Sequence, residues 1–111
     1  YQLLESDYVM KNDNKTYNTI LAIKNSLSDY NLYINSYGLY QDKILNEVSI
    51  ILNKSYFKKS EILDISKKLT KNLNNFSNID IKVYFKSNND TKAFINKNRN
   101  ATKIETYILE D

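Results

Sequence analysis

The sequence predicts a small α+β fold with an αββαβ layout, in which the helices cover one face of a sheet. Three observations predict this fold. Residues 79–86 alternate apolar and polar side chains without a break, which is the period of a half-buried strand. Just upstream, apolar residues recur at helical spacings of three or four: Ile62, Ile65, Leu69, Leu73 and Phe76. The third observation is that residues 30–54 suit two strands better than one helix.

Two helices are expected, one on each side of this strand pair. Residues 15–28 carry an apolar stripe that includes Ile20, Ile23 and Leu27. The second helix spans about residues 61–75, and we expect Ser60 to be its N-cap because a serine hydroxyl can accept a bond from a free backbone N–H group.

Residues 30–54 are the least certain segment of the pattern. A heptad seam through Leu27, Tyr30, Ile34, Tyr37, Ile44, Val48 and Ile51 fits one long helix. The local residues Asn31, Asn35, Ser36 and Gly38 are poor helix formers, however, and favour two strands. We expect Gly38, the chain's one glycine, at the turn or bulge between them. If the segment is helical instead, three helices followed by a strand pair make a winged-helix-like domain.

The two ends of the chain complete the predicted layout. Residues 2–10 read as a first strand, which gives the split βαβ order of ferredoxin-like folds. Residues 90–98, around Ala93, Phe94 and Ile95, are expected to form a short helix, and residues 103–109 a last strand. Residues 11–15 and 87–90 read as loops. The length of 111 residues without a linker predicts a single domain over residues 1–111.

The residue types that are missing exclude most catalytic chemistry. The chain has no histidine and no cysteine, which removes Ser-His and Cys-His nucleophiles and the usual zinc sites. One glycine cannot build a P-loop or a dinucleotide fingerprint. Two weak candidates remain: Ser55 and Lys58 in an S-x-x-K pattern, and the carboxylates of Glu61 and Asp64 one helical turn apart. Chance and the helix dipole explain these two candidates, so we expect no enzyme, no cofactor and no metal.

The charge is distributed unevenly along the chain. Residues 1–52 carry a net charge of −2, residues 53–103 carry +8 and residues 104–111 carry −3. Such a basic segment attracts anionic polymers such as nucleic acid, lipid headgroups or wall polymers, although lysines also simply solvate exposed faces. The candidate anion- or partner-binding residues are Lys58, Lys59, Lys67, Lys68, Lys71, Lys82, Tyr84 and Lys86.

Composition and the chain's start suggest where the protein works. Asn, Lys, Ile and Tyr make up 55 of 111 residues, and their A/T-rich codons indicate a low-GC bacterium or a protist. The chain begins at Tyr1 rather than Met, so we expect upstream residues such as a signal peptide, a lipoprotein anchor, a membrane helix or a tag. No apolar run approaches the roughly 18 residues that span a membrane.

The order strand, capped helix, strand in EVSIILNKS, KSEILDISKKL and IDIKVYFKS resembles several small extracytoplasmic modules. Ring-building domains of secretion and sporulation channels share this layout, as do some sporulation lipoproteins of spore-forming bacteria. The resemblance covers about residues 30–87 and rests on hydrophobic pattern alone. It implies a protein that packs against partners outside the membrane rather than a catalyst.

Two functions follow as hypotheses. The first is a non-enzymatic interaction or assembly module, the soluble portion of an exported or membrane-anchored protein, which binds a protein partner or itself at an extracytoplasmic or cell-surface location. The alternative is a small basic nucleic-acid-binding domain in the cytoplasm. Tyr84 between Lys82 and Lys86 would suit RNA, but the segment lacks the glycines of the RNA-recognition pattern.

Overall fold

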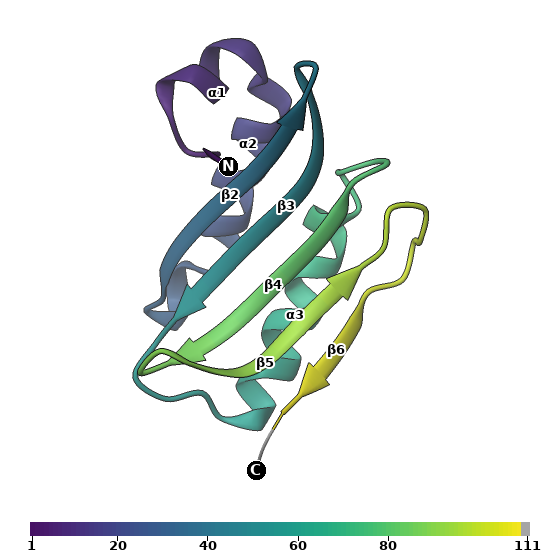
Figure 1. Cartoon of the computed structure of the whole chain (residues 1–111). Helices are drawn as coiled ribbons and strands as arrows, with labels where there is room; N and C mark the ends of the chain where they lie inside the picture. Colours follow the sequence, from purple (N-terminus) through teal and green to yellow (C-terminus); the bar gives the residue numbers. More distant parts are fainter. Residues whose placement is uncertain (110–111) are drawn as a thin grey trace.

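The protein folds around one mixed sheet, which helices cover on one face (Figure 1). The structure is a computed structural model that describes residues 1–109. In this range the six strands are β1 (Gln2–Leu3), β2 (Tyr33–Gln41), β3 (Ile44–Asn53), β4 (Asp80–Ser87), β5 (Asp90–Lys97) and β6 (Glu105–Ile108). The helices of the same range are α1 (Asp7–Asn12), α2 (Asn14–Ser26), the 3-10 turn η1 (Ser28–Tyr30) and α3 (Lys59–Leu73).

The strands lie side by side in the order of the sequence. β3 and β4 are parallel neighbours joined through α3, and the other neighbouring pairs are antiparallel. A split βαβ unit would place another strand between the two parallel strands. The α+β class is confirmed, whereas the ferredoxin-like strand order is not the one observed.

Residues 33–53 form the antiparallel pair β2–β3, so the winged-helix alternative is wrong. The turn between the strands is Asp42-Lys43, whose φ angles of 52° and 67° fit the type I′ turn that matches the twist of a two-residue hairpin. Gly38 is therefore not at the turn. It pairs with Val48 in mid-strand, and a bulge lies one residue further on, between Leu39 and Tyr40.

Gly38 is required by packing rather than by backbone conformation. A Cβ atom at this position would lie 2.6 Å from Cδ2 of Leu4 and 2.7 Å from Cδ1 of Leu45, well inside van der Waals contact. The chain after β1 continues alongside β2, where the Leu4 N–H donates to the Ser36 carbonyl, and the fully buried Leu4 side chain fills the space left by Gly38.

The N-terminal segment corrects two predictions. The strand expected over residues 2–10 ends at Leu3, because the Ser6 hydroxyl accepts a hydrogen bond from the Val9 N–H and caps α1. The loop expected over residues 11–15 shrinks to Asp13, which ends α1 and caps α2. Helix α2 confirms the helix predicted over residues 15–28.

Helix α3 confirms the second predicted helix but begins earlier than expected. Its N-cap is Lys58, whose side chain makes no capping hydrogen bond, so the prediction that Ser60 caps the helix is wrong. The predicted stripe of Ile62, Ile65, Leu69 and Leu73 is buried as expected.

The short helix predicted over residues 90–98 is strand β5 instead. Asn88 and Asn89, with φ angles of 51° and 70°, make a second type I′ turn that folds the chain back along β4. Ala93 and Ile95 then alternate into the core with the period of a strand. Strand β6 confirms the last predicted strand.

The core lies between the helices and one face of the sheet. Alternate residues of the central strands point into it, among them Val48 and Ile50 of β3 and Val83 and Phe85 of β4. Val9, Ile20 and Ile65 reach the same core from α1, α2 and α3. The opposite face of the sheet, toward the viewer in Figure 1, has no helix over it in the described part of the chain.

Candidate functional site

The uncovered face of the sheet presents the polar half of each strand's alternation. Asp80, Lys82, Tyr84 and Lys86 of β4 all lie on this open face, as the period-two pattern predicted. Glu47, Ser49 and Ile51 of the neighbouring β3 share the face.

An apolar and aromatic row crosses the open face from strand to strand. Ile51 pairs with Tyr84, Tyr84 with Phe94, and Phe94 with Tyr107, so consecutive neighbours in the sheet's register bring four large side chains into line. We call Ile51, Tyr84, Phe94 and Tyr107 the aromatic row. Its first three members are half-buried by their neighbours, and Tyr107 at the edge is 42% exposed.

Phe94 has close neighbours from both flanking strands. The Tyr107 ring stacks on it with centroids 4.9 Å apart, and Nζ of Lys82 lies 5.6 Å from its centroid. Tyr107 comes from β6 and Lys82 from β4, so the two reach Phe94 from opposite sides. The aromatic row is therefore one ridge of side chains in contact, not a set of separate rings.

A polar hollow of about 560 Å³ borders the aromatic row on the same face. Glu47, Ser49, Lys82 and Asn96 line it, together with Tyr84 of the row and Tyr1. Asp80 also lines the hollow and is held by Arg99, whose backbone N–H donates a 2.7 Å hydrogen bond to Oδ1 and whose guanidinium lies 3.5 Å from Oδ2. The open face thus combines an apolar ridge with an adjoining polar depression.

The structure divides the basic residues predicted to bind anions between two sides of the molecule. Lys82 and Lys86 flank Tyr84 on the open face of the sheet. Lys67, Lys68 and Lys71 are exposed on α3, in the helical layer behind the sheet, and Lys58 and Lys59 stand at the start of that helix. Nζ of Lys68 lies 6.0 Å from the Tyr30 ring. The eight residues do not form one surface.

The residual catalytic candidates do not assemble into a site. Ser55 is exposed in the connection before α3, Lys58 occupies the N-cap position of that helix, and no hydrogen bond joins them within the described residues. Glu61 pairs with Lys54 at 2.6 Å, while Asp64 is exposed. Residues 1–109 contain no cluster of three acidic, histidine or cysteine side chains that could hold a metal ion. No helix in this range is long and apolar enough to cross a membrane.

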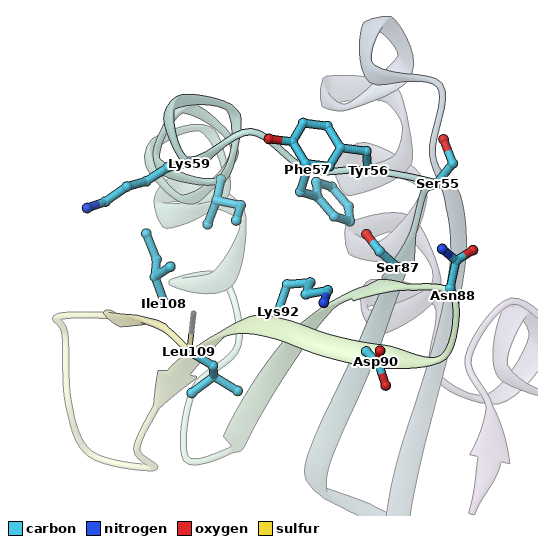
Figure 2. Close-up of a pocket in the computed structure, with 11 residues that line it drawn as sticks. Ser55, Tyr56, Phe57, Lys59, Ser87, Asn88, Asp90, Lys92, Ile108 and Leu109 are labelled. Carbon is cyan, nitrogen blue, oxygen red and sulfur yellow. The ribbon is translucent and has the colours of Figure 1, made fainter. Parts of the chain in front are cut away.

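A second concavity lies where the start of α3, the β4–β5 hairpin and the end of β6 meet (Figure 2). Its volume is about 510 Å³. One wall is apolar and is formed by Phe57, Ile62, Ile108 and Leu109. The remaining lining is polar and includes Ser55, Tyr56, Lys59, Ser87, Asn88, Asp90 and Lys92. We call this concavity the α3 pocket.

Ser87 stands out in the lining of the α3 pocket. It is only 4% exposed, and its Oγ is a buried side-chain oxygen without a hydrogen-bond partner in the described structure. Such a group costs about 1–3 kcal/mol in a folded protein, so an isolated case calls for an explanation. Figure 2 shows the hydroxyl directed toward Tyr56 and Phe57, on the pocket side of the hairpin.

Several of these residues were missed by the sequence analysis for one reason. Phe94 lies within residues 90–98, the segment predicted as a helix, and Ser87 lies just before it, so this prediction hid both the partner of Tyr84 and the second hairpin. The available signal was Asn88-Asn89 followed by a period-two run through Ala93 and Ile95, because paired asparagines favour a type I′ turn.

Comparison with known proteins identifies the fold. The sequence matches no family model and no curated protein. Among solved structures, the sex pheromone staph-cAM373 precursor is similar with a TM-score of 0.81 at 16% identity, over 94% of this chain and 39% of that chain. The C-terminal domain of the sex pheromone staph-cAM373 precursor from Staphylococcus aureus gives a TM-score of 0.80 at 16% identity, over 98% of this chain and 34% of that one.

A third structure belongs to a sex pheromone precursor from Lactobacillus salivarius, with a TM-score of 0.77 and 13% identity over 90% of this chain and 31% of that one. The chain thus spans between 31% and 39% of the length of these solved chains. At such low identity the likeness establishes the fold, which is that of domains of sex pheromone precursors.

Proposed function

We propose that the chain is a non-enzymatic interaction domain of an exported or membrane-anchored bacterial protein, and that it contacts a protein partner through the open face of its sheet. The observation that carries this proposal is the aromatic row of Ile51, Tyr84, Phe94 and Tyr107, which no helix covers in the described residues. Tyrosine and phenylalanine are enriched in the buried centres of protein interfaces, where a ridge of rings desolvates well.

The ring geometry favours a protein partner over a nucleic acid. Base stacking needs an exposed ring face. Phe94 already has Tyr107 stacked on it and the Lys82 ammonium 5.6 Å from its ring centroid, so this ring is engaged by neighbours in the protein itself. The lysines of α3 lie behind the sheet and cannot add to a polyanion track on the open face. A protein surface can instead pack against the ridge from above and form hydrogen bonds in the adjoining hollow.

The names of the similar structures support an extracytoplasmic location. These structures are named sex pheromone precursors, and a pheromone acts outside the cell that makes it. The fold of this chain is that of such domains. The exclusion of histidine, cysteine and phosphate-loop chemistry agrees with a domain that binds rather than catalyses.

Site-specific photo-crosslinking tests the docking surface. A photoreactive phenylalanine analogue is placed at Tyr107 on the aromatic row, and as a matched control at Leu63 on α3, because these side chains are 42% and 43% exposed. In cells of the native host that express the protein with its own upstream sequence, we expect a discrete protein adduct at Tyr107 and none at Leu63. Adducts at both positions or at Leu63 alone would contradict the assignment of the face.

Protease treatment of intact cells tests the location independently. If the domain is extracytoplasmic, added protease removes it from cells stripped of their wall while a cytoplasmic marker survives. Survival of the domain until the cells are lysed would overturn the exported part of the proposal and leave the docking surface to be judged by crosslinking.

A further inference from the structure

We propose that the α3 pocket binds a carboxylate carried on an apolar body. Within the described residues, the Ser87 hydroxyl on the polar side of this concavity has no hydrogen-bond partner and the start of α3 has no side-chain cap, whereas the other side is hydrocarbon. No residue of the proposed docking face lines it, so the two surfaces are separate.

The first set of free donors is the start of α3. The Ile62 N–H makes the first backbone bond of the helix, to the Lys58 carbonyl. The backbone N–H groups before Ile62 therefore precede the helical ladder, and the Lys58 side chain supplies no cap. Helix α3 is 15 residues long, and its uncapped start carries a partial positive charge that favours an anion. Lys59 and Ile62 of this first turn line the pocket.

The second donor is independent of the helix. The Ser87 hydroxyl comes from the end of β4, is buried and lacks a partner. A hydroxyl held in this way gains a partner when a ligand oxygen accepts a hydrogen bond from it. Among the described residues of the lining the one carboxyl is that of Asp90, and Figure 2 shows it directed away from this hydroxyl.

Charge and size narrow the class of ligand. Lys59 brings one full positive charge to the lining and the helix start adds only a partial one, which suits a monoanion such as a carboxylate better than a phosphate dianion. No arginine is present to hold phosphate in a bidentate manner. The volume of about 510 Å³ is that of a small-ligand site and exceeds what a bare carboxylate fills. Phe57, Ile62, Ile108 and Leu109 provide the wall against which an apolar body packs.

An NMR titration of amide chemical shifts tests the charge and the apolar body together. The probes are hexanoate, the neutral isostere hexanamide, and acetate. We expect saturable shifts at Phe57, Ile62, Ser87 and Asn88 with hexanoate in the millimolar range, and weaker binding of both hexanamide and acetate. If hexanamide binds as tightly as hexanoate, or if no probe gives a saturable shift, the proposal is wrong. Equal binding of acetate and hexanoate would overturn the apolar body.

The source of the carboxylate is resolved by a second pair of probes. A short apolar peptide with a free C-terminus is compared with the same peptide amidated. Tighter binding than hexanoate that disappears on amidation assigns a peptide C-terminus. Weaker binding of the free peptide than of hexanoate assigns a free carboxylic acid.

Variants separate a ligand contact from a structural role. Ser87→Ala should lower hexanoate affinity about 10-fold, because a hydrogen bond to a charged group is lost. The same change should leave the thermal midpoint of the free protein unchanged or raise it, since it removes an unpartnered buried hydroxyl. Ser66→Ala is the matched control: Ser66 is also buried, but its hydroxyl donates to the Ile62 carbonyl at 2.8 Å and does not line the pocket.

Charge is tested on the same helix. Lys59→Gln should weaken hexanoate binding about 3-fold at low salt and less at high salt, whereas Lys67→Gln, outside the pocket, should not change it. Equal effects of the two lysine variants would mean that hexanoate responds to overall charge, and would overturn the site. A lower thermal midpoint in Ser87→Ala would mean that the hydroxyl stabilises the free protein, and this result would also overturn the site.

Discussion

The hydroxyl of Tyr40 donates a 2.8 Å hydrogen bond to Oδ2 of Asp13, which joins β2 to the junction of α1 and α2. Asp13 also accepts from the Thr16 hydroxyl at 2.7 Å and from the Thr16 N–H at 3.4 Å, as the N-cap of α2. One carboxylate therefore ends one helix, starts the next and fixes both to the sheet.

Loss of the Tyr40 hydroxyl should measure this link. Tyr40→Phe keeps the ring but removes a hydrogen bond to a charged acceptor in a partly exposed place, so we expect the free energy of unfolding to fall by about 1–2 kcal/mol in urea denaturation. Tyr37→Phe, on the open face of the same strand, is the control and should change the free energy by less than about 0.5 kcal/mol. Equal effects of the two changes would mean that the bond to Asp13 contributes nothing.

The same pair predicts a pH dependence. Burial, followed by the hydrogen bond to Asp13 and its negative charge, raises the pKa of Tyr40 above its ordinary value of 10.0. A raised pKa means that the folded state holds the phenol proton more tightly, so this stabilisation is complete below pH 10 and is lost as the pH rises through the folded-state pKa. In urea denaturation at rising alkaline pH, wild type should therefore lose stability faster than Tyr40→Phe. Parallel losses would contradict the shift.

Removal of the Asp13 side chain should cost more than the loss of a cap alone. Asp13→Ala removes the N-cap of α2 and the acceptor of Tyr40, so we expect a loss of about 2–3 kcal/mol against about 1 kcal/mol for an ordinary cap. A double-mutant cycle with Tyr40→Phe isolates the interaction energy between Asp13 and Tyr40. Strict additivity of the two changes would show that Asp13 and Tyr40 are not coupled.

Gly38→Ala should destabilise the protein through steric overlap. Its Cβ would meet Leu4 and Leu45 at 2.6 and 2.7 Å, and overpacking of a core typically costs about 1–3 kcal/mol. Because the clash is with side-chain ends, the double change Gly38→Ala with Leu45→Ala should lose less than the sum of the single changes. A neutral Gly38→Ala variant in thermal denaturation would refute the packing role of this glycine.

Lys43→Gly should stabilise the β2–β3 hairpin. Lys43 has a φ of 67°, a left-handed conformation that costs an ordinary residue about 1 kcal/mol and glycine almost nothing. The change also creates Asp-Gly, a preferred type I′ pair. We expect a gain of about 0.5–1 kcal/mol in the free energy of unfolding. Lys43→Ala keeps a Cβ atom and should give no gain, so an equal gain from both would point to the lost charge instead.

The sequence predicted that residues 33–53 form two strands, but not the register in which the strands pair. Its apolar pattern was ambiguous because the bulge between Leu39 and Tyr40 makes Asn46 an extra residue, so that Leu45 and Val48 both face the core although they are three positions apart. Ile51 disturbed the pattern for another reason, since it belongs to the aromatic row on the open face. A single-strand pattern cannot reveal either fact.

The candidate surfaces could be predicted from the sequence only in part. Strand β4 placed Lys82, Tyr84 and Lys86 on one face by alternation alone, and the structure agrees. Phe94 and Tyr107 join Tyr84 through pairing across β5 and β6, a contact between strands that no local period encodes. The α3 pocket likewise depends on three chain segments that meet only in the folded protein.

The sequence by itself determined the α+β class, helices α2 and α3, strand β4 and the absence of the residues that most catalysis requires, because these depend on local period and composition. Tertiary structure decided the strand order, the packing of Gly38 against Leu4 and the folding of residues 90–97 as a strand. In each of these the local preference was weak, and burial against neighbouring segments, which acts between residues far apart in the chain, outweighed it.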